Sequence, residues 1–132
     1  MPTGALRVGA FFGAGIAVAN LVLQFVLTPV LPWQLIGALS IGAWLGGVVG
    51  AGVFAGRGGS LRTAAVAAVV AAALDVVRGI AVDLAVGVPA SQAGHLITPG
   101  MAAAASLVEF MFIAPLAAGI GLAAARVTQT GR

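Results

Sequence analysis

The longest uncharged stretch of the chain places the strongest constraint on its fold. No charged residue occurs between Val8 and Gly56, a run of 49 positions rich in aliphatic side chains. A helix that crosses the hydrocarbon core of a bilayer needs roughly 20 residues, so this run is too long for one span. Pro29 and Pro32 divide it, because proline breaks or kinks a helix. The run therefore predicts two membrane-spanning helices.

The remainder of the chain continues the pattern. The sequence is 61% hydrophobic and 7% charged, whereas soluble domains carry about 25% charged residues, so a water-soluble globule is excluded. Disordered chains are polar and poor in aliphatic side chains, which excludes disorder as well. We predict an all-α integral membrane four-helix bundle, a single transmembrane domain over 1–132, with spans at about 8–29, 33–56, 63–87 and 101–125.

The arginines predict the orientation of the bundle. With the N-terminus inside, five of the six basic residues fall on the cytoplasmic side, and the loops 29–33 and 88–100 carry no Lys or Arg. The positive-inside rule then places both termini in the cytoplasm, and we expect the inner membrane of a bacterium or archaeon. These arginines are scattered singly, unlike a nucleic-acid-binding face, so no nucleic-acid partner is expected. The five are Arg7, Arg57, Arg62, Arg126 and Arg132.

No motif in the chain indicates an enzyme. The absence of cysteine removes thiolate metal sites and cysteine nucleophiles. His95 is the only histidine, and we expect it to be a solvated loop residue. No nucleophile elbow, phosphate loop or metal-spaced cluster occurs. We therefore expect no catalytic residues, no cofactor and no metal.

Small residues recur every four positions along the predicted spans. The second span carries Gly42, Gly46 and Gly50, the richest glycine stripe in the chain. Such stripes let helix backbones approach closely in lipid. Packing within one bundle explains them, and so does an interface between copies, for which the second span is the best candidate because it has the most glycines and no charge.

Charged residues inside the spans form the strongest candidate site. The three acids, Asp75, Asp83 and Glu109, all lie within predicted spans, as does Arg78. Each charge costs at least about 2.5–3.5 kcal/mol in the bilayer on insertion scales. We therefore expect these side chains to be paired or to face the interior of the bundle.

Polar residues of all four spans fall at a similar depth. Arg78 and Glu109 lie nine and eight residues from the expected outer ends of their spans, which corresponds to about 13 and 12 Å. Asn20 lies at the same depth on the first span, with Gln24 one turn nearer the outer face, and the second span contributes Ser40 at this level. The sequence therefore predicts one polar layer.

The charge balance of this layer leaves two interpretations. One is a structural bridge from Arg78 to Glu109 or to Asp75 that fixes helix register. In the other, Asp83 is solvated near the interface and one further carboxyl remains without a partner after Arg78 has paired. That carboxyl, Asp75 or Glu109, is then protonated, hydrated or bound to a cation.

Two classes of function follow. The first is an oligomeric transporter or channel, linked to protons or cations, in which Glu109 or Asp75 exchanges a proton beside Arg78. Its expected partners are the lipid bilayer and further copies of the chain, which are parallel because the charge asymmetry specifies one orientation. The second is a non-catalytic accessory subunit of a larger membrane complex, which the near absence of sequence outside the spans favours.

Overall fold

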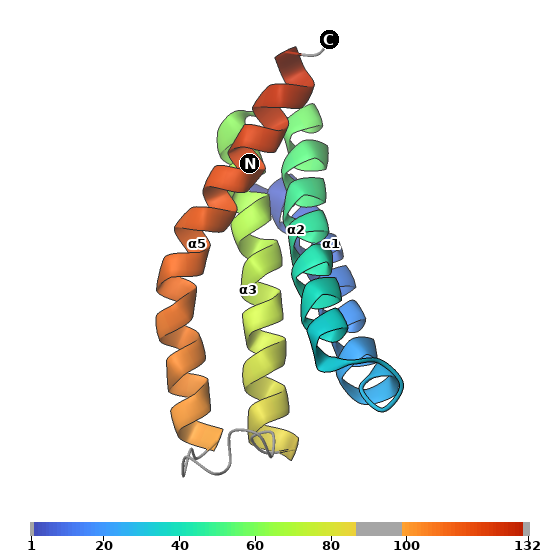
Figure 1. Ribbon diagram of the computed structural model, residues 1–132. Coiled ribbons are helices and arrows are strands. Elements are labelled where there is room, and N and C mark those ends of the chain that lie inside the picture. The colour runs from blue at the N-terminus through green and yellow to red at the C-terminus, as the bar shows by residue number, and fades with distance from the viewer. Residues whose placement is uncertain (1, 87–98, 131–132) are drawn as a thin grey trace.

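The computed structural model describes residues 2–86 and 99–130, and these ranges are helical almost throughout, with no strand. Each of the four long helices is long and apolar enough to cross a membrane. The prediction of an all-α chain with four such helices is therefore confirmed. The elements are α1 (Pro2–Val22), the π-helical segment η1 (Leu23–Leu27), α2 (Trp33–Gly58), α3 (Leu61–Val86) and α5 (Pro99–Thr130) (Figure 1).

The turn between α2 and α3 is shorter than the predicted segment 57–62. Only Gly59 and Ser60 separate the two helices. The Thr63 N–H donates to Ser60 Oγ and the Ser60 N–H donates to Thr63 Oγ1, each at 3.3 Å. This reciprocal cap satisfies N–H groups that the first turn of a helix leaves without partners, so α3 begins directly after α2.

The outer bounds of the helices also differ from the predicted spans. α1 begins before its predicted span and α5 ends after its own, so Arg7 and Arg126 lie within helices. Both arginines lie near helix ends, where long basic side chains reach the polar interface of a membrane. His95 and most of the predicted loop 88–100 lie outside the described residues.

Helices α2 and α3 form the centre of the bundle. Each of them contacts the three other long helices, whereas α1 and α5, over their described lengths, do not contact each other. Figure 1 shows α1 beginning and α5 ending at the same end of the bundle as the turn between α2 and α3. We call this end the arginine end, because it holds Arg7, Arg57, Arg62 and Arg126, and the opposite end the open end.

Small side chains make the contacts at the arginine end. Gly52 of α2 lies against the backbone of Gly121 in α5, and Gly56 lies against Ala125 one turn further on. Close backbone approach of this kind holds helices together in lipid, where the hydrophobic effect between helices is lost. The buried hydrophobic residues of α2, α3 and α5 all belong to this half: Val48, Ala51, Ala55, Ala64, Ala67, Ala68, Ala71, Ala72, Ala117 and Ala125.

The helices separate toward the open end. No described residue of α2 before Val48, of α3 after Ala72 or of α5 before Ala117 is fully buried. The α3 surface changes at this level from alanines to larger side chains, including Asp75 and Arg78. These side chains prevent the close backbone approach that alanine and glycine allow, so the bundle is closed at one end and open at the other.

Pro115 lies inside α5, at the boundary between the closed and open halves. Proline has no N–H to donate to the Met111 carbonyl, and it bends a helix for that reason. Figure 1 shows α5 changing direction near its middle, so that its C-terminal half leans over α3 toward α2.

We predict that Gly52→Ala destabilises the bundle by about 1–3 kcal/mol, the usual cost of overpacking a close contact. A Cβ at this position would lie 2.5 Å from Gly121 Cα, which is backbone and cannot yield easily. The measurement is chemical unfolding in detergent micelles, followed by circular dichroism.

Gly119→Ala is the matched control on the partner helix α5, because nothing lies within 4 Å of a Cβ there. We expect the control to be neutral or slightly stabilising, since alanine favours helix by up to about 1 kcal/mol over glycine. Equal stability of the two variants would contradict this account of the packing.

Candidate functional site

Asn20 joins three helices through its side-chain amide. It is 6% exposed and is the one buried polar residue in the described part of the chain. Its Nδ2 donates to Asp75 Oδ1 of α3 at 2.8 Å, and its Oδ1 accepts a hydrogen bond from Ser40 Oγ of α2 at 2.6 Å. Donor and acceptor are thus both used, and α1, α2 and α3 are held at one level.

Arg78 extends this arrangement along α3 and back to the first helix. Its Nε donates to Asp75 Oδ1 at 2.9 Å, and the two side chains are 19% and 18% exposed. Its Nη1 donates to Gln24 Oε1 at 3.5 Å. We call these five residues, Asn20, Gln24, Ser40, Asp75 and Arg78, the polar network. In the described residues, no buried side-chain nitrogen or oxygen lacks a hydrogen-bond partner.

The π-helical segment η1 contains Gln24 and was not predicted from the sequence. In a π-helix each N–H donates a hydrogen bond to the carbonyl five residues earlier. The donor for the Gln24 carbonyl would therefore be residue 29, which is a proline and has no N–H. The Thr28 hydroxyl donates to this carbonyl instead, and also to the Leu23 carbonyl at 2.9 Å. The Thr28–Pro29 pair is the sequence signal for this segment, and π-helical turns frequently occur at functional sites.

Glu109 of α5 faces the polar network across a cavity of about 480 Å³ between α2, α3 and α5. Its side chain is exposed in the single copy. No hydrogen bond or ion pair from the described residues reaches its carboxylate. The walls of this cavity are formed by Ser40, Ile41, Trp44, Asp75, Val76, Glu109, Ile113 and Leu116.

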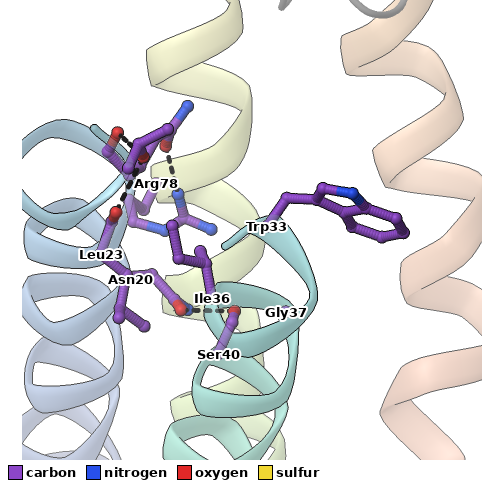
Figure 2. Close-up of a pocket in the computed structure, with 9 residues that line it drawn as sticks. Asn20, Leu23, Trp33, Ile36, Gly37, Ser40 and Arg78 are labelled. Atoms are coloured by element: carbon purple, nitrogen blue, oxygen red, sulfur yellow. Dashed lines mark hydrogen bonds between the residues drawn. The ribbon is translucent and has the colours of Figure 1, made fainter. Parts of the chain in front are cut away.

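A second cavity, of about 540 Å³, lies on the other side of the polar network, between the first helix, α2 and α3. Figure 2 shows Asn20 and Ser40 joined at its floor, with Arg78 above them and the Trp33 indole pointing away from both. Ser40 lines both cavities, whereas Arg78 lines this one and Asp75 lines the other. The Asp75–Arg78 pair and the Asn20 amide therefore separate the two cavities.

The oxygen atoms of this region suit a proton or a hard cation. Asp75 and Glu109 supply carboxylates and Ser40 supplies a hydroxyl to one cavity wall. Carboxylate and hydroxyl oxygens favour hard cations over soft metals. The described residues include no group of three His, Cys, Asp or Glu side chains placed to hold a metal ion.

The structure brings four of the five predicted polar residues into direct hydrogen-bonded contact: Asn20, Gln24, Asp75 and Arg78. Of the two bridges considered for Arg78, it forms the one with Asp75. Glu109 shares a cavity with Asp75 but is not bonded to the polar network. Asp83 is partly buried, one helical turn or more beyond this level.

The glycine stripe of α2 is divided between two environments. A Cβ on Gly50 would meet the Phe12 ring of α1, so this position packs inside the bundle. Nothing lies within 4 Å of a Cβ on Gly42 or Gly46, which face open space in a single copy. The close contacts of α2 with α5 are made instead by Gly52 and Gly56.

Comparison with protein-family models, with curated proteins and with solved structures finds no match to this chain.

We predict that Asn20→Ala destabilises the protein by about 1–3 kcal/mol, because it leaves the Ser40 hydroxyl without its acceptor and removes one of the two donors to Asp75 Oδ1. The measurement is the free energy of unfolding in micelles. Ser106→Ala is the control, since the Ser106 hydroxyl bonds only to the Ala102 carbonyl of its own helix, at 3.1 Å. An equal effect of both variants would exclude a bracing role for Asn20.

Proposed function

We propose that the chain is a small integral membrane transport protein, linked to protons or cations, whose pathway passes between Glu109 and Asp75. One observation carries the proposal: Glu109 is an unpaired carboxylate inside a membrane-length helix, and it lines the same cavity as the polar network. Ionisable groups within a membrane-spanning helix are functional candidates by default.

The charges of the layer support a cationic cargo. Asp75 and Arg78 compensate each other at 2.9 Å, so Glu109 leaves the layer with one net negative charge. Glu109 lies nine residues after the start of its apolar span at Gly100, about 13 Å into the bilayer. A carboxylate at this depth gains from a proton, a cation or water, because the surrounding lipid solvates none of its charge.

The packing supports access to the site from one side of the membrane. At the open end, no fully buried residue of α2, α3 or α5 closes off either cavity. At the arginine end, buried alanine and glycine residues pack the helices together. In the orientation we propose, the arginine end is cytoplasmic and the open end faces outward. Transport then requires loosening of the alanine contacts or a pathway between copies.

A parallel homo-oligomer is part of this proposal. Gly42 and Gly46 present an open, small-residue surface on α2, and Glu109 is exposed in a single copy. Copies packed around this half of the bundle would cover both features and enclose the carboxylate. The exposed apolar side chains elsewhere on the helices are those that lipid covers.

We expect the purified protein in liposomes to conduct protons or alkali cations, and Glu109→Gln to reduce this flux to that of empty liposomes. Glutamine keeps the size of the side chain but cannot bind and release a proton or neutralise a cation. The measurement uses an entrapped pH-sensitive dye with imposed proton, sodium and potassium gradients.

Asp83→Asn is the matched control, because it neutralises another carboxylate of a membrane-length helix that lines neither cavity. Its flux should equal that of the unmodified protein. Full flux in Glu109→Gln, or no protein-dependent flux for any of the three cations, would overturn the proposal.

The second candidate is an accessory subunit of a larger membrane complex. The open half of the bundle favours this candidate too, because Gly42, Gly46 and Glu109 are uncovered there. Other chains could cover these residues in place of further copies of this one. The two candidates differ in what occupies this half.

Native mass spectrometry after mild extraction from the source membrane separates them. We expect a discrete homo-oligomer, which the double variant Gly42→Leu/Gly46→Leu dissociates because leucine prevents close approach of the helices. Gly15→Leu is the control, at an equally open position on α1. A stoichiometric complex with other chains would identify an accessory subunit instead.

A further inference from the structure

A groove at the arginine end combines an aromatic floor with basic residues. It lies between α1 and α2, has a volume of about 270 Å³ and is separate from both cavities of the open end. Its walls are almost entirely apolar apart from one guanidinium. They are formed by Arg7, Val8, Phe11, Phe12 and Phe54.

Ring contacts hold the floor of the groove in place. Phe12 packs edge-on against Phe11 at 5.4 Å between centroids and lies 5.5 Å from Phe54. Gly50 leaves the space that the Phe12 ring occupies, since a Cβ there would lie 2.5 Å from the ring. Phe11 and Phe54 remain 74% and 55% exposed, so the floor presents apolar surface to the surrounding lipid.

A second arginine borders the same floor. The guanidinium carbon of Arg57 lies 5.2 Å from the centroid of the Phe54 ring, a cation–π contact that places its charge beside the groove. Arg7 lines the groove directly, and both arginines are exposed. Two cations from different helices thus border one apolar surface, at the level where two membrane-length helices begin and end.

These two cations have no carboxylate from their own helices. Asp75 is the first acid in the sequence, so α1 and α2 contain none. Neither Arg7 nor Arg57 forms an ion pair with any described residue. The described acids Asp75, Asp83 and Glu109 all lie in the other half of the bundle, beyond the last buried alanine of α3 or before the first of α5. The groove is therefore complementary to an anion.

We infer that this groove binds an anionic phospholipid, with the phosphate between Arg7 and Arg57 and an acyl chain along Phe11 and Phe54. A phospholipid supplies both the anion and the apolar chain that the two surfaces need, and it reaches the groove directly from the adjoining leaflet. Basic pockets between membrane helices bind anionic head groups in this way. This site is independent of the proposed transport pathway.

The test compares phosphatidylglycerol with phosphatidylcholine of identical acyl chains, titrated onto the full chain in mild detergent and followed by native mass spectrometry. We expect phosphatidylglycerol to be retained preferentially. The double variant Arg7→Gln/Arg57→Gln should weaken this binding by roughly 25-fold, about five-fold for each arginine. Thermal unfolding checks that the variant folds, and the single variant Arg7→Gln should lose about five-fold if the double variant does not fold.

Arg62→Gln is the matched control, because Arg62 is exposed at the same end but lies outside the groove. It should leave binding unchanged. Equal retention of the two lipids by the unmodified protein would overturn the inference. So would an equal loss in Arg62→Gln, which would indicate attraction by general surface charge. Displacement of phosphatidylglycerol by glycerol phosphate at equal concentration would assign the site to a soluble anion instead of a lipid.

Discussion

The Asp75 carboxylate is the point on which the open half of the bundle depends. One of its oxygens accepts hydrogen bonds from both Asn20 Nδ2 and Arg78 Nε, and through Asn20 it is linked to Ser40 on α2. A charge here would be costly in lipid, and these contacts replace the water it has lost. They also link α1, α2 and α3 at the level where alanine packing ends. The fourth helix, α5, has no part in them, and this leaves Glu109 facing a cavity.

The bundle therefore has two halves held together by different means. At the arginine end, glycine and alanine allow backbones to approach closely, and dispersion contacts and the short α2–α3 turn hold the helices. At the open end, hydrogen bonds of the polar network replace such contacts. The contacts of α2, α3 and α5 thus give one tightly packed half and one loosely packed half within 132 residues, and the groove that Arg7 and Phe54 line lies on the tightly packed half.

The hydropathy and charge pattern of the sequence was sufficient to predict the number and approximate bounds of the helices. The uncharged run from Val8 to Gly56, broken by two prolines, predicted two helices, and the helices of the structure agree with the four spans to within several residues. The depth comparison uses the same kind of information, because a helix rises 1.5 Å per residue whatever its neighbours are. It set Asn20, Gln24, Ser40, Arg78 and Glu109 near one level; the first four belong to the polar network, whereas Glu109 only lines a cavity beside it. Each of these predictions uses only position along a helix axis.

The sequence by itself determined the number of helices, the end at which the arginines gather and the depth of the polar residues. Only the tertiary structure decided which way each helix turns about its axis. These helices are apolar on all sides, so periodicity does not reveal which face is inward. For this reason the sequence left open whether Arg78 pairs with Asp75 or Glu109, and it did not reveal that Gly42 and Gly46 face open space while Gly52 and Gly56 contact α5. Side-chain partners depend on rotation and close packing, which hydropathy does not record.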